Sequence, residues 1–300
     1  MNIHLIKSKG LARRYLWLGL MLSLLVGLAL VADFLVSSPR YSKKEPMMKR
    51  ISESRQYDQG TFRNANPWDA KVGDMLATLG EYISSETPRK PQLPLPMKRA
   101  DIKAWREIPD DSLGSIWLGH STVLLRLNGY HLLLDPVLEP SVSIVGPKRY
   151  NGSVPLDPAD LPGLDVVIIS HNHYDHMNKA SLLAVAGRTR RFVCPLGLGA
   201  HLKRWGIQAE KIVELDWWQS FALDEGLILV ATPAQHFSGR GLRDRNRTLW
   251  ASWVIMGPRH RVFFSGDSGY FKGFRDIGEQ YGPFDLTFLE CGAYNPRWHP

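Results

Sequence analysis

Residues 165–176 read DVVIISHNHYDH, an apolar, strand-like run that ends in a dense group of histidines and an aspartate. Because side chains alternate along a strand, His171 and His173 point to the same side while the backbone is still extended. Asp175 and His176 follow where the chain leaves the strand, so they can turn toward a second position nearby. With ten histidines in 300 residues, this pattern rarely arises by accident. The segment therefore predicts a metal site at the end of a strand.

Two further side chains of the same types follow strand-like runs elsewhere in the chain. His236 ends the run LILVATPAQH, and Asp267 comes directly after RVFFSG. Six imidazole and carboxylate ligands exceed what one tetrahedral zinc needs, and two cations that share a carboxylate explain the number. These ligand types suit Zn²⁺, with iron or manganese also possible. The set predicts a binuclear enzyme that hydrolyses an ester, amide or phosphodiester with a metal-bound hydroxide.

The remaining histidines, the cysteines and the tryptophans are not assigned to the metal site. His120 lies in GHST at an early strand turn, and both a role beside the ligands and a structural hydrogen bond remain open. We expect His131, His201 and His260 to be structural or on the surface. Two cysteines are too few for a disulfide framework or thiolate site, and we expect both in the core. The tryptophans are expected in the core, although a lipid cavity wall is the alternative.

Charge and hydropathy separate the N-terminal part from the rest. The net charge is +8, but residues 1–50 hold nine Lys and Arg against Asp33 and Glu45, which leaves about +1 for the remainder. A nucleic-acid enzyme would carry its basic excess on the catalytic domain, so nucleic acid is not an expected partner. Residues 15–36, YLWLGLMLSLLVGLALVADFLV, are long enough to cross a bilayer as a helix.

We expect this apolar segment to be an uncleaved single-pass anchor that places the protein at the membrane, in the cell envelope. The alternative is a cleaved signal peptide, but the run exceeds a usual signal core and lacks an A-x-A site before Asp33. Positive residues flank both ends, so the sequence leaves open which side of the membrane the enzyme faces.

The sequence divides into a basic segment with the anchor (1–37), a tether with a Pro-rich linker (38–111), and a hydrolase domain (112–300). The tether is expected to have little core of its own. In the domain, Asn128-Gly129 between two apolar runs predicts a hairpin. Strand-like runs later alternate with helix-like segments, which predicts mixed sheets covered by helices.

From about Trp117 to Trp298 the chain resembles the N-acylphosphatidylethanolamine-hydrolysing phospholipase D branch of the metallo-β-lactamase superfamily. The motif HxHxDH identifies only the superfamily, whereas ELDWW, SGDSGY and GAYNPRW at these spacings are far more specific. The matching runs also include WLGHST, LLLDPV, GPKRY, PLGLGAHL, TPAQHF, LWASWVIMGP and GPFDL. This resemblance implies an α/β fold, the four-layered αβ/βα sandwich.

The resemblance also implies roles for the candidate residues. His171, His173 and His236 would bind one zinc, Asp175 and His176 the other, and Asp267 would bridge them. Asp175 and Asp267 are thus the catalytic candidates, and Tyr174 would contact the phospholipid headgroup. The reaction would release an N-acylethanolamine and phosphatidic acid, so the expected partners are a phospholipid and the membrane.

The family has a further substrate-contacting histidine and a last metal-binding histidine beyond GAYNPRW, whereas this sequence ends at Pro300. We therefore expect the C-terminal part of the domain to be missing and the second zinc to be held more weakly. Two other functions remain open: a metal-dependent hydrolase of a soluble phosphodiester or lactone, and a membrane-tethered binding protein without turnover. Acyl-chain preference and oligomeric state have no indication in the sequence.

Overall fold

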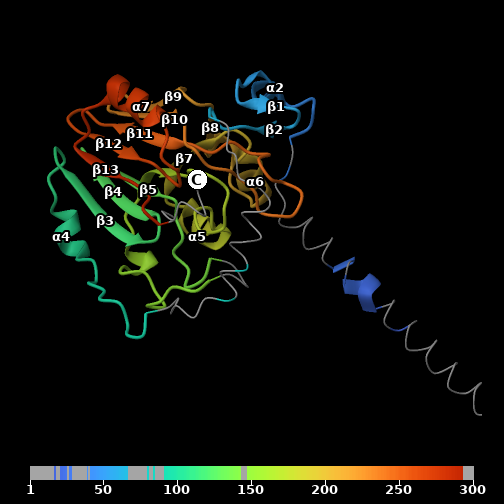
Figure 1. The fold of residues 1–300 in the computed structure, drawn as a ribbon. Coiled ribbons are helices and arrows are strands. Elements are labelled where there is room, and N and C mark those ends of the chain that lie inside the picture. Colours follow the sequence, from blue (N-terminus) through green and yellow to red (C-terminus); the bar gives the residue numbers. More distant parts are fainter. Residues whose placement is uncertain are drawn as a thin grey trace, which may run out of the picture.

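The computed structural model describes residues 41–66, 91–142 and 147–292, with a few isolated residues before and between these ranges. Two β-sheets make up the centre of the described domain (Figure 1). The first sheet has six strands in sequential order. They are β3 (Leu113–Gly119), β4 (Thr122–Leu127), β5 (Tyr130–Leu134), β6 (Leu164–Ile168), β7 (Thr189–Pro195) and β8 (Ile212–Leu215). Its first three strands are antiparallel and its last four run parallel.

The turn between β4 and β5 is the hairpin that the sequence predicts. Asn128 and Gly129 have φ angles of 50° and 86°, the left-handed conformations that a tight hairpin turn of this kind requires. The parallel strands that follow are connected through helices or longer loops.

The second sheet has five strands in the order β13-β12-β11-β10-β9. They are β9 (Ser220–Asp224), β10 (Leu227–Thr232), β11 (Ser252–Met256), β12 (Arg261–Phe264) and β13 (Leu286–Phe288). All neighbours are antiparallel except β12 and β13, which are parallel. Because β10 and β12 both pair antiparallel with β11, they end at the same edge of the sheet.

Three hydrophobic cores show that the molecule has four layers. The largest core lies between the two sheets and holds side chains of both, such as Leu125 and Trp253. A second core packs the outer face of the first sheet against α4 (Ile102–Arg106), α5 (Lys179–Ala186) and α6 (Gly199–Arg204). A third packs α7 (Gly273–Tyr281) on the outer face of the second sheet. The αβ/βα sandwich expected from the sequence is therefore confirmed.

Residues 41–66, which the sequence assigns to the tether, pack against this domain. They form α2 (Pro46–Glu53), β1 (Tyr57–Asp58) and β2 (Thr61–Phe62). Tyr41, Ile51 and Phe62 are buried in the core between the sheets. Widely spaced apolar residues in a polar stretch give no periodic pattern, so the sequence does not reveal this packing.

Several expected features fall outside the described residues. These are the anchor (residues 15–36), of which only isolated residues are described, and residues 293–300, which hold most of the motif GAYNPRW. In the part of the chain that the structure describes, none of the helices is both long and apolar enough to span a bilayer.

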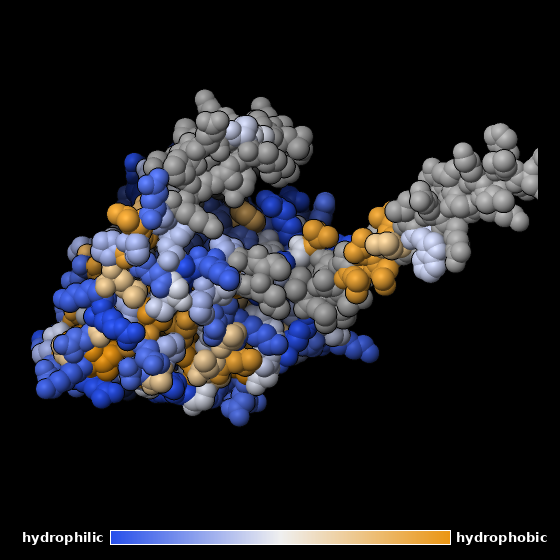
Figure 2. Space-filling view, turned by 90° about the horizontal axis from the view of Figure 1, so that it is seen from below, coloured by the Kyte–Doolittle hydropathy of each residue, from blue (hydrophilic) through white to orange (hydrophobic). Residues whose placement is uncertain are grey.

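Apolar residues on one face of the domain are distributed as in a globular protein. In Figure 2 they appear in small groups among hydrophilic ones over the coloured part of the surface. This matches a domain that places most of its apolar side chains in the three cores.

Candidate metal centre

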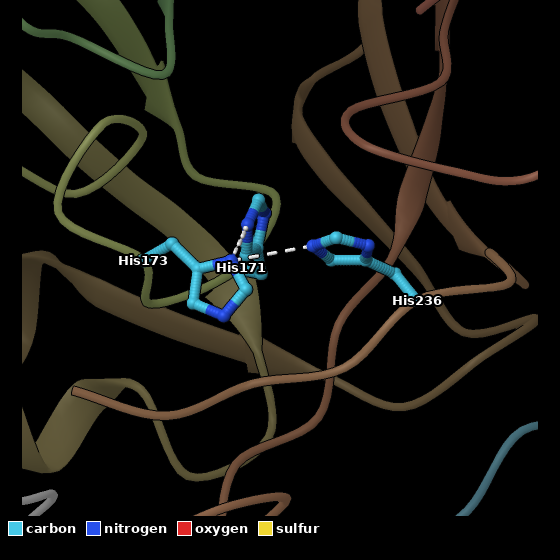
Figure 3. Close-up of side chains that lie close together, drawn as sticks. All are labelled: His171, His173 and His236. Carbon is cyan, nitrogen blue, oxygen red and sulfur yellow. Dashed lines mark hydrogen bonds between the residues drawn. The ribbon is translucent and has the colours of Figure 1, made fainter. Parts of the chain in front are cut away.

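Three imidazole rings from two sheets meet at one edge of the sandwich (Figure 3). His171 and His173 lie in the loop after β6, and His236 lies in the loop after β10. His171 Nε2 is 2.8 Å from His173 Nδ1, which is 3.3 Å from His236 Nε2. The three ring nitrogens thus converge on a common point.

The protonation state of these rings fits a cation at that point. Burial lowers the pKa of His173 to about 4 and that of His236 to about 3. Burial also lowers the pKa of His171 well below its ordinary value, and the neighbouring histidines add to this effect. All three rings are therefore neutral near pH 7, the state in which imidazole is a metal ligand.

A second group of ligands lies beside the first. His176 Nε2 is 3.2 Å from Asp267 Oδ1, and His236 Nε2 is 3.8 Å from Asp267 Oδ2. The carboxylate of Asp267 therefore lies between an imidazole of each group. His176 Nε2 is buried, and among the described residues it has no partner with hydrogen-bond geometry. A buried nitrogen of this kind, facing a carboxylate, has the chemistry of a metal ligand.

The loop with Asp267 is held against the His171 loop by a close backbone approach. Gly266 has a φ of 54°, and a Cβ at this position would lie 2.6 Å from the Cβ of Ser170. A larger residue at 266 would push the two loops apart. The motif FFSGDSGY thus brings Asp267 to the histidines because glycine precedes it.

Residues 130–300 match the family model described as the beta-lactamase superfamily domain. The chain belongs to the metallo-β-lactamase superfamily. It is thus a metal-dependent hydrolase of that superfamily, and the His and Asp clusters described above are its candidate metal-binding groups.

Three relatives illustrate what the chain is similar to. An uncharacterized protein of Mycobacterium tuberculosis is 43% identical over 84% of this chain and 68% of its own. An N-acyl-phosphatidylethanolamine-hydrolyzing phospholipase D of Caenorhabditis elegans is 39% identical over 63% of this chain and 56% of its own. The mitochondrial protein of that name from Saccharomyces cerevisiae is 34% identical over 61% of this chain and 40% of its own.

Asp135 is a site residue of this superfamily member that sequence reasoning missed. Its carboxylate is fully buried and lies 2.7 Å from His176 Nδ1. Ser170 donates to it from both its backbone nitrogen (2.7 Å) and its hydroxyl (2.6 Å). The hydroxyl of Ser170 is also 2.9 Å from His171 Nδ1. One carboxylate therefore orients imidazoles of both ligand groups.

The sequence contains an indication of this role. Asp135 directly follows β5 in LLLDPV, and β5 runs parallel to β6, so the aspartate comes to the same edge as His171. Its φ of 41° is a left-handed value that is uncommon for a residue other than glycine. Burial raises the pKa of Asp135, while His176 opposes that rise.

Tyr174 projects from the ligand loop, and its position is fixed by the loop that follows His236. Its hydroxyl donates to the carbonyl oxygen of Arg240 at 3.1 Å, and the Arg240 guanidinium lies 3.9 Å from the ring centroid. Arg240 in turn donates to the carbonyl oxygens of Asn172 and Met177 in the ligand loop. The guanidinium thereby joins the two loops beside the histidines.

Asn64, in the N-terminal segment, supports His236 although it precedes the region that matches the superfamily. Its amide group donates to His236 O at 2.8 Å, and its amide oxygen accepts from His236 N at 3.0 Å. Trp250 Nε1 also donates to that oxygen. One side chain thus satisfies both backbone polar groups of a candidate ligand.

The residues excluded from the site lie mostly where the sequence places them. His201 is buried on α6 and packs beside Trp205, and His260 lies near Asn128 in the turn between β11 and β12. Cys194 is buried, but the expectation of a core position is wrong for Cys291, which is exposed. Trp217, Trp250 and Trp253 are in the core between the sheets, as expected. The same expectation is wrong for Trp117 and Trp218, which are exposed.

Proposed function

We propose that this chain is a zinc-dependent phosphodiesterase of the phospholipase D type, acting on N-acylphosphatidylethanolamine or a related phospholipid. The observation that carries the proposal is the 39% identity to the phospholipase D of Caenorhabditis elegans. The sequence motifs ELDWW and SGDSGY support it, because they are more specific than the ligand motif of the superfamily.

The residues that would hold two zinc ions are those that the sequence names. His171, His173 and His236 form one group, and Asp175 and His176 belong to the other. Asp267 has one oxygen toward each group and is suited to a shared ligand. When bound, the two cations would polarise the phosphodiester and lower the pKa of a water molecule.

The side chains around the ligands would bind and orient the substrate. The guanidinium of Arg240 lies over the ring of Tyr174 and thereby fixes the orientation of that ring beside the ligand loop. We assign Tyr174 to the phospholipid headgroup, next to Asp175. Burial opposes the negative charge on Asp175, but the hydrogen bond from His120 and the charge of His176 outweigh it and lower the pKa of Asp175. Asp175 is therefore a carboxylate at neutral pH.

Large apolar side chains near the ligands fit a lipid substrate. Trp117 precedes His120 by three residues, Tyr270 follows Asp267 by three, and both are largely exposed. Leu242, in the loop of Arg240, is exposed as well. An apolar segment at residues 15–36 would hold the enzyme at the bilayer in which such a substrate stays.

The test compares lipid and soluble substrates with the same protein. The 300-residue chain, purified in detergent and supplied with Zn²⁺, is assayed on vesicles that contain N-acylphosphatidylethanolamine and on bis(p-nitrophenyl) phosphate in solution. We expect release of an N-acylethanolamine and phosphatidic acid from the vesicles, and none from a D267A variant. Turnover of the soluble diester or a lactone alone would contradict the lipid substrate, and binding without turnover would contradict the enzyme.

A further inference from the structure

His120 has a strained backbone that the fold maintains. It lies in the turn between β3 and β4, with a φ of 51°, and Gly119 before it has a φ of 96°. Few residues other than glycine adopt this region, and the surrounding contacts hold His120 in it. Here Trp117 Nε1 donates to His120 O at 2.6 Å, and Arg149 donates to Leu118 O at 3.2 Å.

This conformation brings the ring of His120 to the second ligand group. His120 Nε2 lies 3.0 Å from Asp175 Oδ2, and the His120 ring meets the His176 ring edge to face at 5.2 Å. One ligand atom from each of these three residues lies within 4.8 Å of the other two. About half of the His120 side chain is exposed, so burial in the core does not explain the strain.

We propose that His120 is a ligand of the cation that Asp175 and His176 hold. The inference rests on the proposed two-cation site and deepens it. Without His120, the described residues offer three protein ligands at this position, with Asp267 shared. His120 adds an imidazole nitrogen, a usual ligand of zinc, and brings the ligands that the described residues offer at this position to four. The expectation of a weak second site, made from the sequence, did not include this ligand.

A different role for the same contact makes a different prediction. If His120 only donated a hydrogen bond to Asp175, it would orient that carboxylate and leave the ligand set unchanged. Loss of such a partner lowers metal affinity by about 10–100-fold. Loss of a ligand also changes the coordination sphere, which the d–d absorption of bound Co²⁺ reports directly.

The experiment uses the full chain and the variant H120N. Asparagine tolerates the left-handed φ of this turn, so the backbone is kept while the imidazole is removed. We expect wild-type protein to bind two Zn²⁺ per chain. H120N should keep one and hold the second more weakly, by more than the roughly 100-fold upper limit for loss of a hydrogen-bond partner, in chelator competition. The Co²⁺ spectrum of H120N should differ from that of wild type, and added imidazole should restore it in H120G.

The matched control is H260N, because His260 is also a histidine in a turn between strands but lies near Asn128. It should bind two cations with wild-type affinity. Two cations held equally well by H120N, or an unchanged Co²⁺ spectrum, would overturn the assignment of His120 alone. A wild-type chain that binds no cation would overturn the proposed function with it, so the two failures are distinguishable.

Discussion

Replacing Asp135 with asparagine tests how the second ligand group is organised. The substitution keeps the volume of the side chain, and asparagine accepts the φ of 41° at this position. Its amide oxygen can still accept from Ser170 N, which is 2.7 Å from the carboxylate. Its NH₂ group would then face His176 Nδ1, which is 2.7 Å from the other oxygen.

The consequence is a change of tautomer at His176. An NH₂ group can only donate, so His176 Nδ1 must accept and the ring proton must move to Nε2. That nitrogen is the one that faces Asp267. A protonated Nε2 has no lone pair for a cation, so D135N should disable His176 as a ligand although residue 135 contacts the ring at Nδ1 and not at the metal-binding nitrogen.

The size of the effect follows from the kind of contact that is lost. Removal of a hydrogen-bond partner behind a ligating histidine costs about 10–100-fold in metal affinity, or about 1.4–2.7 kcal/mol. The free energy of unfolding should fall by about 1–3 kcal/mol, because the two buried hydrogen bonds to this oxygen, from Ser170 Oγ and His176 Nδ1, change sense. The free energy of unfolding of D135A should fall by about 3–5 kcal/mol, since this substitution leaves His176 without its buried partner.

The assay measures Zn²⁺ affinity by chelator competition, together with thermal unfolding. The control is D165N, which makes the same chemical change at a carboxylate that accepts from His131 N and Arg190. We expect D165N to retain wild-type affinity for both cations. If D135N binds the second cation as tightly as wild type, the tautomer argument is refuted.

Three further predictions address other parts of the site. N64A should weaken the first cation site and destabilise the fold by about 1–3 kcal/mol, since it leaves both backbone groups of His236 unpaired. Metal titration and thermal unfolding would show both effects, and the control N66A should show neither. D267A should lose both hydrolysis and metal, while H260A keeps both, as rate and metal content would show. Zn²⁺ at 100 times its Kd should raise the free energy of unfolding by about 2.7 kcal/mol over chelated protein; no shift in Tm would contradict a cation site in the fold.

The predictable part of the site comes from local patterns. His171, His236 and Asp267 each follow an apolar strand, and strands that end at one edge bring their following loops together. The Asn-Gly turn between β4 and β5 is local in the same sense. Such features depend on periodicity and turn chemistry within about ten residues, so they can be recognised in the sequence alone.

Other residues depend on neighbours that a sequence does not reveal. Asp135 looks like the end of an ordinary strand until the pairing of β5 with β6 places it beside Ser170 and His176. For His120 the sequence leaves two roles open, because the decisive facts are a backbone angle and a distance to Asp175. Neither has a signature in residue type or spacing.

The contacts of the N-terminal segment are also not predictable from the sequence, because they join residues far apart in the chain. Asn64 lies in a polar stretch that predicts a tether, yet its amide holds the backbone of His236, which is 172 residues further along the chain. The contact exists because Phe62 is buried between the sheets and Tyr41 donates to Glu214 at 2.5 Å beside α6. His120 and Asn64 both precede residue 130, where the superfamily match begins. The metal centre therefore depends on the chain from at least residue 41 onward. Residues before the superfamily match support its ligands and, at His120, supply one of the proposed ligands.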